Sequence, residues 1–350
     1  MKRIFYGLFC LPFIIISCDK NKDTTREAFI GEDITKNSVI EIDKKTKEAY
    51  LKIDTKGEWT LYNGKSTDSI DFSKPLLSGT GSGSFKLTTP ENQRAYYFLK
   101  TQEGTAFLAE SQLPMEGGFN FRDLGGIRNK DGKYIQWGKI FRSDELHNLT
   151  ARDLTYLASI PVVSVVDFRS EEEMQTAPDK LPSSVKKYYA YSIVPGNLNI
   201  DIKSLNHLQP TQLDTMMMQM NISFVTDSVY YGRYKEFFSL LMDENKIPLM
   251  YHCTAGKDRT GMATALILYA LNVDEPVIME NYLLSNLYLE DKYKDIKAEH
   301  PVLKSLFDVK PEFLQAGIDQ MKKDHGSVEN FLRDVLDVDI EKFREMYLYK

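Results

Sequence analysis

Hydrophobic and polar residues alternate in short runs between residues 38 and 112. Turn-forming residues separate these runs, among them Asn63-Gly64 and the glycine-rich stretch 79–83. The runs richest in β-branched and aromatic residues lie at 39–42, 49–53, 58–62 and 95–99. Short strands at this spacing predict a small all-β sandwich of immunoglobulin or fibronectin type over residues 38–112. Within it, Trp59 is expected to be a core residue and not a ligand platform.

The pattern changes from about residue 113, where apolar strands alternate with helical segments. Residues 161–167 (PVVSVVD) and 247–251 (IPLMY) are apolar nearly throughout, which is typical of strands covered on both faces. Residues 260–271 are apolar on all sides and predict a buried helix. Residues 273–350 are expected to be helical, with Ser327 as the N-cap of the last long segment. Residues 113–350 are thus predicted to form an α/β domain, a sheet flanked by helices.

The first residues have the pattern of an export signal. A basic start at residues 1–3 is followed by an apolar run at 4–16 that is too short to span a bilayer comfortably. The run ends in IISC at 15–18, which resembles a bacterial lipobox, so residues 1–17 are predicted to be a signal peptide and Cys18 a lipidated N-terminus. The alternative is an ordinary signal peptide with a chance cysteine. Residues 18–37 are polar and predicted to be a flexible tether, and the protein is expected in the cell envelope, held on a membrane surface by lipid.

Composition narrows the possible functions. The hydrophobic fraction of 42% indicates a globular protein, and the net charge of −6 argues against general nucleic-acid binding. Three cysteines exclude a disulfide-stapled scaffold. Cys10 would leave with the signal peptide and Cys18 would carry lipid, so Cys253 is expected to be the free thiol of the mature protein. The five histidines show no metal-ligand spacing, and we expect neither a metal nor another cofactor.

The segment HCTAGKDRTG at 252–261 carries the chemistry. It joins a predicted strand to a predicted helix, so its backbone N–H groups and the helix dipole can cradle a tetrahedral dianion. Gly256 permits the tight turn, and Arg259 offers two parallel donors to phosphate oxygens. The same positive field would favour the Cys253 thiolate, which could attack phosphorus. Thr260 is expected to donate its hydroxyl to that thiolate.

This segment resembles the loop of the cysteine-dependent protein tyrosine phosphatases. NFRDLGG at 120–126 and FRSDEL at 141–146 narrow the match to the atypical bacterial tyrosine phosphatases, and the similarity extends over about 114–350. Further matching segments lie at 166–173, 282–286 and 326–348. The resemblance implies a tyrosine-phosphatase-like sheet and a reaction through a cysteinyl-phosphate. The β region lies outside it.

The resemblance also implies roles for single residues. Cys253 would be the nucleophile and Arg259 the phosphate clamp, with Thr254, Ala255 and Gly256 supplying backbone donors. Lys257 could contact a second phosphate on an inositol ring or simply point to solvent. Asp258 is the leading general acid, or a brace for the loop, because no Trp-Pro-Asp motif is present and residues 193–197 (IVPGN) contain no aspartate. Asp201 and Asp214 follow, but nothing marks either of them.

Other residues have open alternatives. Asn120, Arg122 and Asp123 are expected near the site, with Arg122 and Asp123 as substrate contacts, although NFRDLGG also suits a structural turn. His252 is expected to order the loop or to be a core histidine. Asp167, with Arg169, is a supporting group or a structural ion pair. Residues 197–227, with their Met-rich face, are either a mobile lid or a core helix, and the tyrosines at 230, 231 and 234 are expected in the core.

Together these features predict a metal-independent phosphomonoester hydrolase acting on phosphotyrosine. Phosphoserine, phosphothreonine and phosphoinositides are further candidate substrates. Rhodaneses and arsenate reductases also place a cysteine in an anion-binding loop, but their loop length or position fits less well. The alternative from another class is a catalytically silent, lipid-anchored phospho-ligand receptor. In either case the β domain could bind a protein partner.

Overall fold

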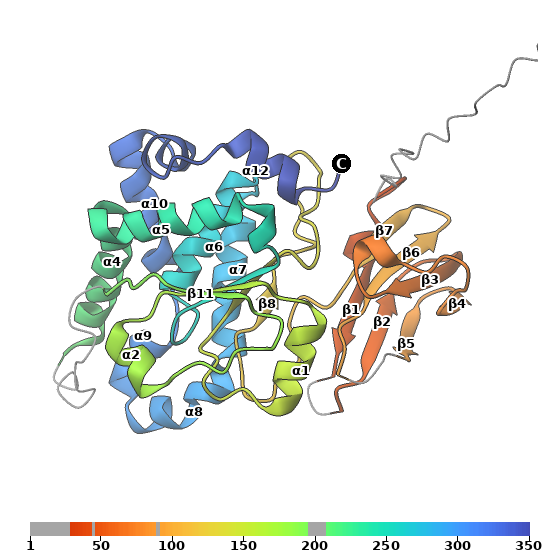
Figure 1. The fold of residues 1–350 in the computed structure, drawn as a ribbon, viewed down its shortest axis with the longest axis horizontal. Helices are drawn as coiled ribbons and strands as arrows, with labels where there is room; N and C mark the ends of the chain where they lie inside the picture. Colours follow the sequence, from red (N-terminus) through yellow and green to blue (C-terminus); the bar gives the residue numbers. More distant parts are fainter. Residues whose placement is uncertain (1–28, 44–45, 89–91, 195–207) are drawn as a thin grey trace, which may run out of the picture.

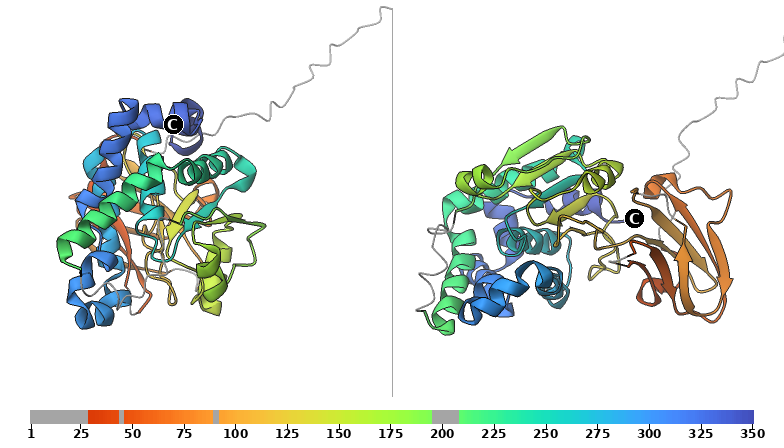
Figure 2. Two further views of the ribbon diagram at one scale, coloured as in Figure 1. Left: turned by 90° about the vertical axis from the view of Figure 1, so that its left-hand side faces the viewer. Right: turned by 90° about the horizontal axis from the view of Figure 1, so that it is seen from below.

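The protein combines an N-terminal β sandwich with a larger α/β domain, as Figure 1 shows. The computed structural model describes residues 29–43, 46–88, 92–194 and 208–350. The predicted signal peptide, Cys18 and the first part of the predicted tether lie outside the described residues. Figure 2 shows the sandwich beside one end of the α/β domain, with the C-terminus near the junction.

The N-terminal domain consists of two antiparallel sheets, which confirms the predicted sandwich. One has the order β1-β2-β5 and the other the order β4-β3-β6-β7. In chain order the strands are β1 (Ser38–Ile42), β2 (Ala49–Ile53), β3 (Glu58–Gly64), β4 (Leu77–Thr80), β5 (Gly83–Leu87), β6 (Tyr96–Thr101) and β7 (Thr105–Leu108). Trp59 lies in the core at 2% exposure, as predicted, and its indole N–H donates to the Gly81 carbonyl at 3.1 Å.

The predicted tether was wrong for its last residues. Ile34–Asn37 form the short 3-10 helix η1, and Ile34 is buried in the sandwich core. The ring of Phe29 stacks on that of Tyr134, with centroids 4.1 Å apart. These apolar contacts give the segment a packed position that its polar composition did not reveal.

The α/β domain is built on a five-stranded sheet of order β11-β10-β12-β9-β8. The strands are β8 (Arg122–Asp123), β9 (Ile140–Ser143), β10 (Ser164–Asp167), β11 (Lys187–Ala190) and β12 (Leu249–His252). All neighbours run parallel except β8, which pairs antiparallel with β9. The parallel strands therefore end at one edge of the sheet, the edge from which the cysteine loop departs.

Helices cover both faces of this sheet, as the apolar strands predicted. Val165 and Met250 pack into a cluster with α1 (Ala151–Ser159), whereas Val166 and Tyr251 face the larger core on the opposite side. The helices not yet named are α2 (Glu171–Thr176), α4 (Pro210–Thr226), α5 (Ser228–Leu241), α6 (Arg259–Ala270), α7 (Glu275–Tyr288), α8 (Glu290–Glu299), α9 (Lys304–Phe307), α10 (Pro311–His325), α11 (Val328–Asn330) and α12 (Ile340–Tyr347). Short 3-10 turns complete the list: η2 (Thr67–Ser69), η3 (Glu244–Lys246) and η4 (Pro301–Leu303).

Helix α6 is buried along nearly its whole length, which confirms the prediction from its apolar sequence. Ser327 caps a helix, but only the short α11, because a π turn at Phe331–Val335 and Asp337 at φ 59° interrupt the segment before α12. The prediction of one long final helix was therefore wrong. Within the described residues, no helix combines the length and apolar character needed to cross a membrane.

The two domains share a buried contact. Arg94 of the β sandwich is 3% exposed, and its guanidinium lies 2.9 Å from the carboxylate of Asp123 in β8. Next to it, the indole N–H of Trp137 donates to the Phe107 carbonyl at 3.1 Å, and the ring of Tyr349 stacks on that of Phe107. An apolar cluster with a desolvated ion pair at its edge fixes the sandwich to the strand that carries Arg122 and Asp123.

Candidate active site

The loop between β12 and α6 presents a row of unbonded backbone donors. From Thr254 to Arg259, no backbone N–H donates a hydrogen bond to another described residue. The carbonyl groups of the same loop are bound from behind. Asn120 Nδ2 donates to the Ala255 and Gly256 oxygens at 3.1 and 3.0 Å, and Lys292 Nζ to the Thr254 oxygen at 3.3 Å. Carbonyls held away from the site leave the N–H groups free for an anion.

Gly256 is required by the curvature of this loop. Its φ of +65° lies in the left-handed region, and a Cβ atom there would lie 2.2 Å from the Ser143 carbonyl oxygen. The close approach brings the loop against the end of β9. Arg142 of that strand donates to the Gly256 carbonyl at 2.6 Å.

Arg259 is held in one orientation by Glu173 of α2. Two parallel hydrogen bonds of 2.9 Å join the guanidinium to the two carboxylate oxygens. The Thr254 hydroxyl also donates to this carboxylate. Partial burial disfavours the charged carboxylate, but the Arg259 guanidinium outweighs it and lowers the pKa of Glu173 to about 2. The pair is charged at neutral pH and fixes the plane in which Arg259 can meet phosphate oxygens.

We expect Glu173→Gln to lower kcat for a phosphomonoester about 10- to 100-fold, because Arg259 loses the partner that orients it. The matched control is Glu171→Gln, an exposed glutamate on the same short helix. Steady-state kinetics of both variants at neutral pH checks the expectation. Equal activity of the two would show that Glu173 does not position Arg259.

Cys253 lies at the base of the loop and is 3% exposed. Thr260 is buried on the first turn of α6, and its hydroxyl has no hydrogen-bond partner among the described residues. Its support of the Cys253 thiolate therefore stays a prediction. Tyr234 of α5 donates its hydroxyl to the Arg259 carbonyl at 3.0 Å and buries the helix start.

Asp258 and Lys257 form an ion pair at the rim of the loop. The Lys257 ammonium lies 3.0 Å from Asp258 Oδ2 and donates to the Asp308 carbonyl at 3.3 Å. The Lys257 side chain is 5% exposed, so it does not simply point to solvent. Asp258 Oδ1 has no hydrogen-bond partner among the described residues. One carboxylate oxygen is therefore anchored by Lys257, and the other is buried without a partner.

A comparison with known protein families shows to which family the chain belongs. The family described as "Tyrosine phosphatase family" matches residues 113–349. The chain belongs to this family. The match excludes the β sandwich, so the sandwich is an addition to the family's domain in this phosphatase.

Two named relatives and one solved structure are among the proteins with similarity to this chain. The phosphatase is 32% identical over 241 residues to a Cupriavidus necator protein named "Putative tyrosine-protein phosphatase H16_A0669", covering 65% of this chain and 85% of that protein. It is 23% identical over 269 residues to the "Triple specificity protein phosphatase PtpB" of Mycobacterium tuberculosis, covering 65% of this chain and 94% of the relative. Among solved structures, a crystal structure of TpbA from P. aeruginosa matches at 13% identity and a TM-score of 0.25, covering 55% of this chain and 96% of that one.

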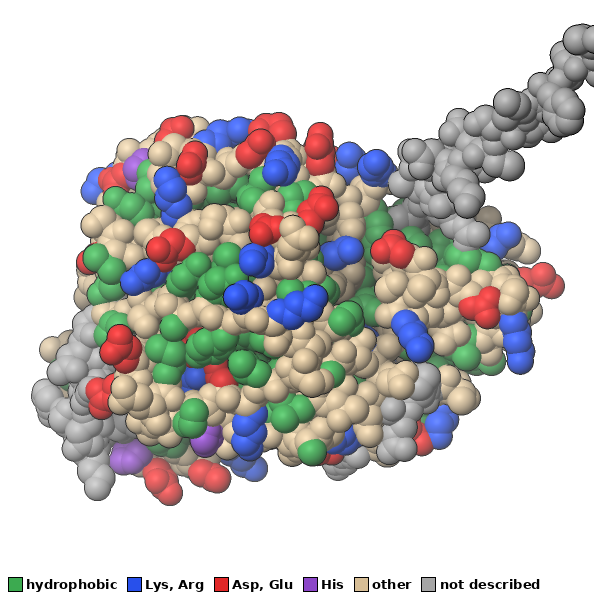
Figure 3. All heavy atoms as spheres, viewed as in Figure 1, with side chains coloured by type: hydrophobic (Ala, Val, Ile, Leu, Met, Phe, Trp, Pro, Cys, Tyr) green, Lys and Arg blue, Asp and Glu red, His purple; other side chains and the backbone are tan. Residues whose placement is uncertain are grey.

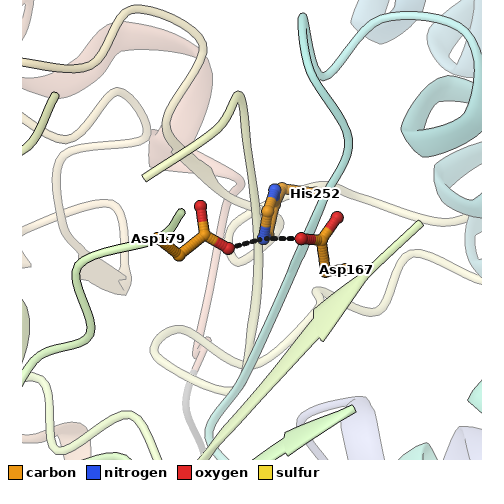
Figure 4. A group of neighbouring side chains, drawn as sticks. All are labelled: Asp167, Asp179 and His252. Atoms are coloured by element: carbon orange, nitrogen blue, oxygen red, sulfur yellow. Dashed lines mark ion pairs between the residues drawn. The ribbon is translucent and has the colours of Figure 1, made fainter. Parts of the chain in front are cut away.

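His252 of the phosphatase is part of a buried ionic network behind the loop. Figure 4 shows its imidazole between two carboxylates, with Nε2 3.0 Å from Asp179 and 3.8 Å from Asp167. Its Nδ1 lies 3.2 Å from the Cys253 carbonyl oxygen. Burial disfavours the imidazolium, but Asp167 and Asp179 outweigh it and raise the pKa of His252 to about 9. His252 thus orders the loop as a cation.

The same three side chains bring their donor atoms together as metal ligands do, within 4.8 Å. Arg169, however, already binds both carboxylates, at 2.8 Å to Asp167 and 2.8 Å to Asp179. A protonated imidazole cannot coordinate a metal. The donor set therefore fits an ion-pair network, and Asp167 with Arg169 is a structural pair in this network.

The raised pKa of His252 predicts lower stability in alkaline solution. Such a group stabilises the fold fully below its unfolded pKa of 6.5, and this contribution is lost as the pH rises through about 9. In a Cys253→Ser background, we expect the free energy of unfolding to fall by about 3 kcal/mol between about pH 6 and pH 10. Urea denaturation followed by circular dichroism measures it. His252→Gln in that background should flatten the curve, and equal slopes would contradict the expectation.

The NFRD segment lies behind the loop and not in front of it. Asn120 is fully buried and binds the loop carbonyls, as described above. Arg122 is also fully buried and donates to Asn120 Oδ1, the Asn281 carbonyl and the Ser285 hydroxyl. Asp123 is 1% exposed and accepts from Gly125 and Gly138 besides pairing with Arg94. The structure thus corrects the predicted substrate contacts of Arg122 and Asp123: both face protein, because they hold β8 in place.

The predicted lid region is only partly described. Its residues 197–207 lie outside the described residues. The remainder, α4, buries residues such as Leu213, Met217 and Phe224 and packs along α10. For this part the core-helix alternative holds. Of the three tyrosines that follow, Tyr234 is fully buried.

The face drawn in Figure 3 carries hydrophobic side chains over and around β11, with charged side chains recessed among them. Tyr188 of β11 and Val194, which follows that strand, are each 37% exposed. The Ile193 carbonyl next to them accepts from Arg259 at 3.3 Å, so this exposed edge of the sheet adjoins the loop.

Proposed function

We propose that this protein is a phosphotyrosine phosphatase that works through a cysteinyl-phosphate on Cys253. One observation carries the proposal: the backbone N–H groups from Thr254 to Arg259 have no partner among the described residues, and they directly follow Cys253, the free and buried thiol of the described chain. A site built only to bind phosphate would not need that thiol. Membership of the tyrosine phosphatase family supports the same conclusion.

In the first step, the Cys253 thiolate attacks phosphorus in line with the leaving oxygen. An S–P bond forms and the P–O bond breaks, and the leaving oxygen takes a proton from Asp258. The loop N–H groups and the Arg259 fork hold the three remaining phosphoryl oxygens, where charge gathers in the transition state.

In the second step, water attacks phosphorus and the S–P bond breaks. The Asp258 carboxylate takes a proton from this water, which restores the acid for the next cycle. The sulfur leaves as a thiolate, and Thr260 is placed on the first helical turn to donate to it. Each role is filled by a side chain of this chain.

The test is phosphate release by the full-length protein, solubilised in detergent, with chelator present. A phosphotyrosine peptide, the matching phosphoserine peptide and a monophosphorylated inositol lipid serve as substrates. We expect the phosphotyrosine peptide to be turned over fastest. Faster release from the phosphoserine peptide or from the inositol lipid would show that this compound, and not phosphotyrosine, represents the preferred substrate class. No release from any of them, with phosphopeptide still bound, would favour the receptor alternative.

The second part of the proposal is export as a lipoprotein. It rests on the basic start, the short apolar run and the IISC tetrapeptide ending at Cys18. Metabolic labelling with a radioactive fatty acid in a bacterial host tests it, with Cys18→Ser as the variant and Cys10→Ser as the control. Labelling that survives in Cys18→Ser would overturn this part and leave the enzymatic part untouched.

A further inference from the structure

Two arginines stand opposite each other beneath the loop. Arg122 of β8 and Arg142 of β9 are direct partners across the antiparallel pair, so their side chains lie on the same face. Both are fully buried. Like charges in this arrangement repel, and burial adds the cost of removing each from water.

No carboxylate compensates this pair among the described residues. The titratable groups that face it are Tyr251 of β12, Tyr282 and Tyr288 of α7, and Cys253. Burial, and then the neighbouring Arg142, lower the pKa of Arg122 well below its ordinary value. A guanidinium nevertheless stays charged at neutral pH.

The other buried arginines of the described chain behave differently. Arg94 pairs with Asp123, Arg169 with Asp167 and Asp179, and Arg259 with Glu173. Every one of them therefore faces a carboxylate. The missing counter-ion is a special property of Arg122 and Arg142.

The pair is joined directly to the loop. Arg142 donates to the Gly256 carbonyl at 2.6 Å, and Arg122 binds Asn120, which holds the Ala255 and Gly256 carbonyls. While Asp258 is ionised, the charges around the loop cancel, because Lys257 pairs with Asp258 as Arg259 does with Glu173. In that state the net positive charge of the site lies in the buried pair.

We propose that Arg122 and Arg142 are the cationic base of the anion site, with the Cys253 thiolate and the bound phosphate as their counter-ions. This inference rests on the proposed phosphatase function. The two arginines act as positioning residues through the loop, without touching substrate. Without an anion, the two guanidinium groups repel each other. A bound anion lowers this repulsive energy because its negative charge lies close to both of them.

The experiment measures the ionisation of Cys253 directly, without substrate. The full-length protein is alkylated with iodoacetamide across a pH series, and the rate reports the fraction of thiolate. We expect Arg142→Gln to raise the midpoint of the curve of alkylation rate against pH by about one pH unit. At a pH below that midpoint, alkylation should then be roughly tenfold slower than in the wild type. Arg142→Lys keeps the charge and should stay close to wild type. Arg333→Gln, which changes a half-buried arginine far from the loop in sequence, is the control.

Two further readouts separate charge from structure. Thermal unfolding with inorganic phosphate should show stabilisation of the wild type and a smaller effect in Arg142→Gln. Without phosphate, Arg142→Gln should unfold no earlier than Arg142→Lys, because both variants lose the guanidinium bonds to Asn281 and Gly256 and only lysine keeps the repelling charge. An unchanged alkylation midpoint in Arg142→Gln, or earlier unfolding of Arg142→Gln than of Arg142→Lys, would overturn the proposal. Alkylation does not need turnover, so a wild type that releases no phosphate but shows the shift would refute only the phosphatase function.

Discussion

Cys253→Ser is expected to lose phosphate release by at least about four orders of magnitude while keeping its affinity for phosphopeptide. A serine hydroxyl stays protonated at neutral pH, so no nucleophile is present. The binding groups are untouched by the change, since backbone N–H groups and Arg259 form the cradle. Stopped-flow kinetics with the wild type and equilibrium binding of a fluorescent phosphotyrosine peptide to the variant measure the two quantities.

The control for this variant is Cys253→Ala, which removes the polar atom altogether. Both variants should bind peptide, and neither should form the cysteinyl-phosphate that rapid denaturation traps in the wild type with ³²P-labelled substrate. Residual release of more than about one per cent in either variant would point to another nucleophile, because loss of a nucleophile costs far more than this.

Arg259→Lys is expected to lower kcat about a hundred- to a thousandfold. Lysine keeps the positive charge but cannot form the two parallel bonds that join the guanidinium to Glu173 at 2.9 Å. The ammonium therefore has no fixed orientation toward the phosphoryl oxygens. Steady-state kinetics should show the loss chiefly in kcat, because the interaction strengthens in the transition state.

Arg333→Lys is the matched control for this change. Arg333 also forms a two-pronged pair with a glutamate, Glu341, at 2.9 and 2.6 Å, but on the protein surface. We expect this variant to have wild-type kinetics. A loss in Arg259→Lys no larger than that of the control would show that the fork geometry of Arg259 has no part in catalysis.

The sequence predicted the parts of the site that are local in the chain. The loop, the strand before it and the apolar helix after it are contiguous, and their patterns are read within a few residues. The β sandwich was predictable for the same reason, since alternation and turn residues mark each strand. The break between α11 and α12 was not predictable from the sequence. It depends on a positive φ at Asp337, and aspartate occurs in helices as well as in turns.

The supporting residues could not be assigned from sequence, because they lie far from the loop along the chain. Glu173 precedes Arg259 by 86 residues, and Arg142 precedes Gly256 by 114. Arg142 and Glu173 lie within segments that resemble the family. A single sequence, however, does not show which residue of such a segment forms a hydrogen bond with the loop. Arg122 and Asp123 were placed in the right region with the wrong partners, since alternation within a two-residue strand sends them to opposite sides.

That alternation has a consequence for where this protein can be cut. Arg122 faces the loop, and its neighbour Asp123 faces Arg94 across the junction with the sandwich. A fragment that starts at residue 113, where the family match begins, would leave the Asp123 carboxylate without the Arg94 guanidinium that pairs with it. It would also uncover the apolar surface around Trp137. We therefore expect a fragment that includes the sandwich to be more stable than one cut where the family match begins.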